Sequence, residues 1–208
     1  MKKAECRMQK LTAAAPEPGS AFLILHSSFC ILPPRLLPGI LALAFYAVYV
    51  WHWVRIGKSE NILWVCHLGC LLVGVGWLAG WPLANAIGLL WLLPGICFWG
   101  IYLAGGGDFN FPSLLTHAGG NALGLWGAAT LGIPEGAWWK AGLGYAGMML
   151  ISSRVSRPSE NVNFSRQVWT GWERRFPSYR RYVAGLVLGA FALFFALERA
   201  LGWLLPRG

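Results

Sequence analysis

Long apolar blocks alternate with short polar connections along most of the chain. Six blocks rich in Leu, Ala, Gly and Trp cover residues 36–54, 62–80, 85–103, 113–133, 138–152 and 182–204. A helix rises about 1.5 Å per residue, so that about 20 uncharged residues cross a hydrocarbon layer of about 30 Å. The connections are short except for residues 153–181, and short links place successive helices antiparallel. The pattern predicts an all-α polytopic membrane protein, a six-helix transmembrane bundle over residues 36–205.

The N-terminal segment 1–35 has a different pattern. It begins with a polar, basic stretch that contains Pro and Gly, which predicts a flexible tail. The apolar run at 21–32 is interrupted by His26-Ser27-Ser28 and ends at Pro33-Pro34, so it is too short to span a bilayer. We predict that this segment is flexible or interfacial and precedes the bundle.

The composition indicates the same class of protein. Of the 208 residues, 56% are hydrophobic and 12% are charged, and the mean hydropathy is +0.52, which excludes an ordinary soluble domain. The net charge of +9 does not indicate nucleic-acid binding, because the basic residues stand at the ends of apolar blocks or in the 153–181 connection. At those places they face lipid headgroups, so membrane lipids are the expected partners. For a multi-pass protein of the cell (inner) membrane, the positive-inside rule predicts that this connection lies in the cytoplasm. Lys2, Lys3, Arg7 and Lys10 of the N-terminal tail favour the reverse orientation unless the tail is dispensable.

The 153–181 connection carries seven arginines and two glutamates. We expect an amphipathic interfacial helix here, capped by Ser159, with Val162 and three aromatic residues on its apolar side. The cations predicted to bind anionic headgroups are Arg166, Arg174, Arg175, Arg180 and Arg181. A solvated basic loop without a helix is the alternative.

Polar side chains converge at one end of the predicted bundle. His52 lies near the end of the first block, Cys66 near the start of the second, and His117 near the start of the fourth. Antiparallel connections therefore bring them to one membrane leaflet, where polar groups are more often functional than on a soluble surface. His117 and Asn121 share a helical face through their i,i+4 spacing. We predict a pocket between the second and fourth blocks, bordered by the glycine-rich loop 105–108.

The neighbouring cysteines and histidine receive structural interpretations. Cys70 and Cys97 are expected to behave as small hydrophobes. His67 follows Cys66 directly and so points about 100° away on a helix, which makes it less expected than Cys66 to face the same cavity.

A thiol and an imidazole at this depth suggest acyl transfer. Cys66 is the candidate nucleophile, because the positive end of a helix dipole and a nearby imidazole both favour a thiolate. His117 is the candidate base, with Asn121 or Asp108 to orient its ring, and backbone N–H groups of the glycine-rich loop are candidate oxyanion donors. This interpretation describes a lipid acyltransferase, and it uses no metal and no cofactor.

Several short motifs occur in a recognisable order. They are Trp64-Val65-Cys66-His67-Leu68 at the start of one block, Phe98-Trp99-Gly100 at the end of the next, Phe111-Pro112 before His117, and Pro158 before the last block. This order resembles the bacterial YwaF-like integral membrane proteins and their eukaryotic transmembrane relatives. The resemblance implies a cysteine-dependent intramembrane acyltransferase with Cys66 as nucleophile and His117 as base. The chain carries His67 where those relatives tend to have an acidic residue.

Two further classes of function fit the same residues. His52, His67 and His117 are candidates to hold a haem, and Cys66 and Cys70 with a histidine are candidates for a soft metal. The third class is a non-catalytic structural or assembly subunit of a membrane complex, with protein partners inside the membrane. Thirteen tryptophans and many small residues suit such packing surfaces.

Overall fold

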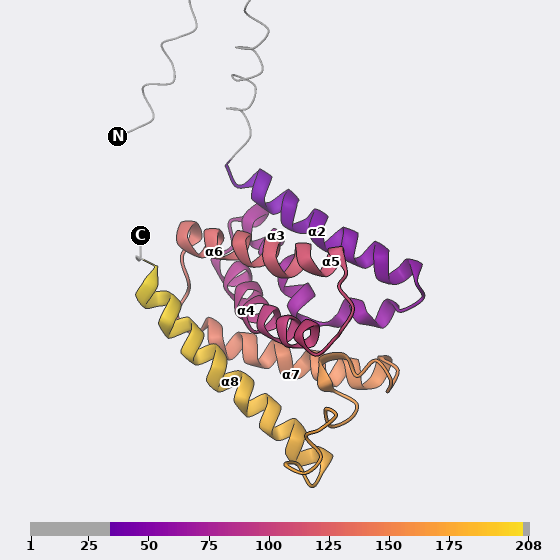
Figure 1. Cartoon of the computed structure of the whole chain (residues 1–208). Coiled ribbons are helices and arrows are strands. Elements are labelled where there is room, and N and C mark those ends of the chain that lie inside the picture. Colours follow the sequence, from indigo (N-terminus) through magenta and orange to yellow (C-terminus); the bar gives the residue numbers. More distant parts are fainter. Residues whose placement is uncertain (1–33, 206–208) are drawn as a thin grey trace, which may run out of the picture. The chain divides into compact units, whose positions relative to one another are not determined.

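The computed structural model describes residues 34–205 and is all-α in that part of the chain (Figure 1). Its α-helices are α2 (Leu36–Arg55), α3 (Val65–Ala79), α4 (Pro82–Ala104), α5 (Phe111–Leu114), α6 (Gly120–Leu131), α7 (Ala137–Val155) and α8 (Tyr179–Leu204). A π-helical turn, η3 (Leu115–Gly119), joins α5 to α6, and the 3-10 turns η2 (Ser59–Leu63) and η4 (Val162–Phe164) lie in connections. The predicted N-terminal segment 1–35 lies outside the described residues except for its last two positions.

Six helical runs occupy the six predicted blocks when α5, η3 and α6 are counted as one run. The end of α3 shows how the sequence sets a boundary. Gly80 has a φ of 60°, and the Trp81 N–H donates to the Gly76 carbonyl at 2.8 Å, which is the Schellman arrangement. Pro82 then begins α4, where the missing proline N–H would have had no helical partner. A tight hairpin therefore joins α3 and α4.

Three helices in the described part are long and apolar enough to cross a membrane, namely α2, α4 and α8. Helix α3 is also apolar but has only 15 residues. Large hydrophobic side chains point outward on these helices, for example Trp51, Ile101 and Leu188, which are 60%, 58% and 70% exposed. Lipid tails cover such a surface at no hydrophobic penalty. These features indicate a multi-pass membrane protein.

Helix α4 lies at the centre of the packing and contacts α3, α6 and α7. In Figure 1, α7 and α8 lie together on the opposite side of α4 from α2. Gly69 of α3 faces Gly88 of α4 so closely that a Cβ on Gly69 would lie 2.6 Å from the Gly88 carbonyl oxygen. The Trp91 indole of α4 donates to the Ala141 carbonyl of α7 at 3.0 Å. Close backbone approach and interhelical hydrogen bonds thus fix the neighbours of α4, as is common in membranes.

The amphipathic helix predicted after Ser159 is absent, which corrects that expectation. Residues 156–178 contain turns and, as regular structure, only the short η4. Asn161, Asn163 and Phe164 have φ values of 40°, 54° and 58°. A right-handed helix cannot contain such values, and asparagine tolerates them better than most residues. The predicted alternative, a loop without a helix, describes this connection.

The apolar residues of this connection form a row of stacked rings instead of a helix face. Ring centroids are separated by 4.9 Å between Phe164 and Trp169, by 6.1 Å between Trp169 and Trp172, and by 5.8 Å between Trp172 and Phe176. Offset aromatic stacking at these distances stabilises the loop without any helical periodicity.

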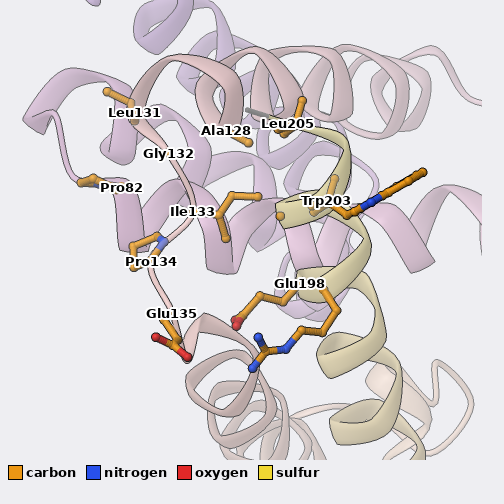
Figure 2. A pocket seen from close by; sticks show the side chains of 13 residues that line it. Pro82, Ala128, Leu131, Gly132, Ile133, Pro134, Glu135, Glu198, Trp203 and Leu205 are labelled. Atoms are coloured by element: carbon orange, nitrogen blue, oxygen red, sulfur yellow. The ribbon is translucent and has the colours of Figure 1, made fainter. Parts of the chain in front are cut away.

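Glu198 is a buried carboxylate near the end of the apolar helix α8, only 6% exposed. Its two oxygens accept hydrogen bonds from the Gly136 N–H at 3.1 Å and from the Trp138 N–H at 2.7 Å. Figure 2 shows the Glu198 side chain reaching from α8 toward the segment that runs from Gly132 to Glu135. Because the N-cap residue of α7 provides no side-chain cap of its own, Glu198 caps this helix from a neighbouring one.

Replacing Glu198 by alanine is expected to lower the free energy of unfolding by about 2–3 kcal/mol, because two helix N–H groups lose their acceptor. Thermal unfolding in detergent measures this effect. Glu135→Ala is the matched control, since Glu135 is an exposed carboxylate that lines the same surface pocket as Glu198 (Figure 2). Equal melting temperatures for the two variants would contradict the capping role.

Candidate functional site

The start of α3 presents two potential ligands in its first turn, Cys66 and His67. This helix has no side-chain cap from its own N-cap residue, Trp64. The cap comes from the 156–178 connection, where the Asn163 side-chain oxygen accepts from the Val65 N–H at 2.9 Å. A loop almost one hundred residues away therefore fixes the point at which α3 begins.

The second contribution comes from the π-helical turn η3, which contains His117. The Gly120 N–H at its end reaches back to the Leu115 carbonyl, five residues earlier. The Ser113 carbonyl accepts hydrogen bonds from the side chains of Thr116 at 3.1 Å and of His117 at 2.9 Å. Single π-turns inside α-helices are rare and occur frequently at functional sites.

The hydrogen bond of His67 fixes the tautomer of its ring. Its Nδ1 lies 2.7 Å from the Thr116 hydroxyl oxygen. That hydroxyl has one proton and lies within hydrogen-bond distance of two carbonyls, those of Pro112 at 3.2 Å and Ser113 at 3.1 Å. Because carbonyls only accept, we assign the hydroxyl proton to them and the Nδ1 proton to His67. The Nε2 lone pair of His67 is then available.

The ring of His117 is oriented in the same manner. Its Nδ1 lies 2.9 Å from the Ser113 carbonyl oxygen, which can only accept, so Nδ1 carries the proton and Nε2 carries a lone pair. A Cβ added at Gly95 would touch the Cβ of Cys66 and would lie 3.5 Å from Cδ2 of His117. The Cδ2–Nε2 edge of this ring therefore lies beside Gly95 and Cys66. Only glycine leaves room for the two side chains at this point of α4.

Cys66, His67 and His117 form a compact group. One potential ligand atom from each of the three lies within 4.8 Å of the others. His67 and His117 are buried, with 5% and 2% exposure, and their ring centroids are 4.6 Å apart in an edge-to-face arrangement. We refer to these three residues as the thiol–imidazole group.

Aromatic rings cover the thiol–imidazole group. Tyr49 of α2 stacks on His67 with ring centroids 3.6 Å apart. Trp99 of α4 lies parallel to His117 at 5.3 Å, and Phe109 packs on Trp99 at 6.0 Å. Both imidazoles are thereby held in one orientation, in surroundings that exclude most water.

Two ion pairs join the connection before α3 to the connection after α7. Lys58 lies 3.3 Å from Glu160, and the Arg157 guanidinium pairs with Glu60. The side-chain hydrogen bond from Arg157 lowers the pKa of the Glu60 carboxyl. The Asn61 amide also donates to Glu160 at 2.9 Å. These contacts lie at the same end of the bundle as the buried Asn163 cap, which joins the same two connections.

Most predicted site residues lie at one end of the bundle, but their roles differ. Cys66 and His117 come together as the sequence predicts. The Asn121 amide donates to the His117 carbonyl at 2.6 Å and to the Leu92 carbonyl at 3.2 Å. It therefore joins backbone segments, and its hydrogen bonds do not orient the imidazole ring. Cys70 is fully buried and its thiol donates to the Ala42 carbonyl at 3.3 Å, which fits the structural interpretation.

The glycine-rich loop forms a hydrogen bond with the end of α4. Its hydrogen bond to a side chain within the described residues runs from the Asp108 N–H to the Tyr102 hydroxyl at 3.0 Å. The imidazole of His117 is oriented by Ser113, so neither Asp108 nor Asn121 performs that task. The residue that follows the loop, Phe109, packs on Trp99, whose ring lies parallel to that of His117.

His67 is the member of the group that helical spacing predicts to point away from Cys66, and among the sequence-based hypotheses only the haem or metal alternative uses it. An ideal helix places it about 100° from Cys66, but its long side chain turns back toward Thr116 and His117. One sequence feature could have indicated a role for His67. The adjacent residues Thr116 and His117 can offer a hydroxyl and an imidazole to one neighbouring helix. His52 instead packs against its neighbour Trp53 with ring centroids 5.4 Å apart.

Comparisons with family models, curated proteins and solved structures find no match to the chain.

Proposed function

We propose that the chain is a six-span membrane protein that binds one metal ion through Cys66, His67 and His117. The observation that carries this proposal is the shared orientation of the two imidazoles. Each Nδ1–H donates to an oxygen, which leaves each Nε2 lone pair without a proton, and the Cys66 thiol belongs to the same compact group. Metal-binding histidines almost always donate their second ring N–H in this way, because the bond fixes both the tautomer and the ring orientation.

The spacing of the group suits a single ion. Metal bonds of about 2.0–2.3 Å bring three ligands to within about 4 Å of one another, so the 4.8 Å spread requires only side-chain adjustment. A haem held by both histidines would have to pass between their rings. Since those rings lie edge to face with centroids 4.6 Å apart, an ion fits the group better than a macrocycle.

Six spans account for the arrangement of the connections. The continuous run 111–131 and α7 have the length of membrane helices, and α3 follows directly on the ordered turn η2. With six antiparallel spans, the connections before α3, before α5 and before α8 lie on one side. The hydrogen bond from the Asn163 amide to the Leu63 carbonyl, at 2.8 Å, supports this assignment for two of them. The positive-inside rule would make that side cytoplasmic in an inner membrane.

Metal analysis of the purified full chain tests the proposed function. We expect one equivalent of a thiophilic metal per chain. Each of the two variants Cys66→Ser and His67→Ala should lose this metal. The variant His52→Ala is the matched control, because His52 is a histidine at the same end of the bundle without a place in the group. Metal retention by all three variants would exclude this centre.

Acyl transfer through Cys66 is the second candidate function. One observation favours it, namely that the Ser113 carbonyl holds His117 as the tautomer that a general base requires. In such a reaction the Cys66 thiolate would attack an acyl carbonyl to form a thioester, and His117 would take the thiol proton and return it to the leaving group. This function would resemble that of the YwaF-like proteins and their relatives.

An alkyne-tagged acyl phospholipid tests this second candidate in metal-free protein. A hydroxylamine-sensitive label on Cys66 that is lost in His117→Ala, but kept in Cys70→Ser, would support acyl transfer. Metal binding without any such label would leave the metal centre as the function.

We also propose that the 153–181 connection binds anionic lipid. Arg174, Arg175, Arg180 and Arg181 are exposed, whereas Arg166 is partly buried and donates to the Ser153 carbonyl. Exposed cations near a charged membrane surface contribute about 1 kcal/mol each. We therefore assign headgroup contact to the four exposed arginines and a structural hydrogen bond to Arg166.

Removing two of these cations, in Arg174→Gln/Arg175→Gln, is expected to weaken binding to anionic lipid by about 10- to 30-fold at low salt. Exchange of labelled phosphatidylglycerol in nanodiscs measures this affinity, and added salt should reduce the difference. Arg166→Gln is the control variant. If the double substitution weakens the binding of neutral lipid in nanodiscs by the same factor, the electrostatic explanation is contradicted.

A further inference from the structure

The donor set of the thiol–imidazole group restricts the kind of metal it can hold. It provides one thiolate sulfur and two imidazole nitrogens. Sulfur is a soft donor that favours copper(I) and zinc, whereas hard cations prefer oxygen ligands. Calcium and magnesium are therefore unsuitable ions for this group.

The number of ligands separates copper(I) from zinc. The described residues contain no fourth His, Cys, Asp or Glu in the group, and the aromatic rings of Tyr49 and Trp99 pack against its imidazoles. Structural zinc is almost always four-coordinate, and zinc with three protein ligands completes its shell with a water molecule. Copper(I) is a closed-shell ion that accepts three ligands, so it needs no further donor in this position.

Charge favours the same choice. Both imidazoles of the group are buried and Cys66 is partly buried, and in the ion pairs Lys58–Glu160 and Arg157–Glu60 each charge already has a partner. A thiolate with copper(I) is neutral overall, whereas a thiolate with zinc(II) leaves one uncompensated positive charge. An unpaired charge is expensive in apolar surroundings.

We infer that the thiol–imidazole group is a copper(I) site in which the Cys66 sulfur and the Nε2 atoms of His67 and His117 hold the ion in a three-coordinate arrangement. This inference rests on the proposed metal-binding function and adds the identity and charge of the ion. On binding, the S–H bond of Cys66 breaks and an S–Cu bond forms, and the proton passes to solvent. No electron is transferred, because copper arrives and remains in the monovalent state.

Competition with a coloured copper(I) chelator tests the inference. The full chain is purified in detergent under anaerobic conditions, with Cys6, Cys30 and Cys97 replaced by serine so that thiols other than Cys66 and Cys70 do not compete. Addition of protein to the copper(I)–bicinchoninate complex should remove one equivalent of copper per chain. Zinc(II), measured in the same protein with a zinc-sensitive dye, should bind more than about 100-fold more weakly, in keeping with the missing fourth ligand.

Variants distinguish the site from other thiols and from loss of folding. Cys66→Ser, His67→Ala and His117→Ala should each lose the copper equivalent, while Cys70→Ser should retain it. The melting temperature of each variant in the absence of metal separates lost ligation from lost structure. Silver(I), a monovalent and redox-inert ion of similar softness, should compete with copper for the same three residues.

The outcomes separate this inference from the proposed function. Zinc binding through the same three residues without a preference for copper would overturn the copper assignment and leave the metal centre in place. If neither ion binds, or if Cys66→Ser binds both ions as well as the unaltered protein, then the copper assignment and the proposed function both fail.

Discussion

Replacing Cys66 by serine is expected to reduce metal affinity by more than about 100-fold, beyond the 10- to 100-fold that loss of an outer-shell partner produces. Serine preserves the size of the side chain but replaces a soft sulfur by a neutral hydroxyl, which is a poor ligand for a thiophilic metal. The affinity is measured by competition with a chelator, and the melting temperature of the metal-free variant shows whether the bundle is intact.

Cys70→Ser is the matched control for this substitution. Cys70 lies one helical turn further along α3 and is also a buried thiol, but it donates to the Ala42 carbonyl and is not part of the group. A serine hydroxyl can replace that hydrogen bond, so affinity should change by less than about threefold, or about 0.6 kcal/mol. Similar losses in the two variants would mean that general packing around α3, and not ligation, determines metal binding.

Replacing Asn163 by alanine is expected to have the second large effect, a loss of about 3–4 kcal/mol in the free energy of unfolding. The Asn163 amide is 1% exposed. It accepts from the Val65 N–H at 2.9 Å and donates to the Leu63 carbonyl at 2.8 Å and the Ser152 hydroxyl at 2.9 Å. Alanine removes all three hydrogen bonds and also disfavours the φ of 54° at this position.

Two further variants separate these causes. Asn163→Gly keeps the backbone freedom but loses the hydrogen bonds, so it should be more stable than Asn163→Ala by about 1 kcal/mol. Asn163→Asp keeps an acceptor for the Val65 N–H and should preserve more metal affinity than either. Unfolding in detergent gives the stability, and chelator competition gives the affinity. Unchanged metal affinity in all three variants would show that the cap does not position Cys66 and His67.

Much of the fold could be predicted from the sequence, because long apolar blocks in a membrane protein leave the backbone few alternatives to helix. The predicted block 36–54 is α2 (Leu36–Arg55), and the predicted block 182–204 lies within α8 (Tyr179–Leu204). The proximity of Cys66 and His117 could also be predicted, since short connections determine at which end of a bundle each residue lies.

The details that decide the chemistry could not be predicted. An ideal α-helical period does not reveal the π-turn around His117. At this turn the Ser113 carbonyl accepts hydrogen bonds from two side chains, those of Thr116 and His117. The ideal period also misplaces His67, whose direction depends on the Thr116 hydroxyl of another helix. The contact between His67 and Thr116 links residues 49 positions apart, so no local pattern encodes it.

The prediction of a helix in the 156–178 connection was wrong for a related reason. The spacing of its apolar residues and arginines matches a helix. Asn163, however, forms its buried hydrogen bonds with a positive φ, which a right-handed helix cannot contain. Glu198 is a similar case, because a carboxylate in an apolar helix gives no sign in the sequence that it caps α7. In both cases, hydrogen-bond partners that are distant in the sequence determine the local structure.

X-ray absorption spectroscopy of the metal-loaded full chain tests the central claim most directly, because it counts the atoms bound to the ion. We expect one sulfur at about 2.3 Å and two imidazole nitrogens at about 2.0 Å, with the sulfur contribution lost in Cys66→Ser. A shell that contains two sulfurs, or one made only of oxygen atoms, would contradict the assignment of Cys66, His67 and His117 as the metal site.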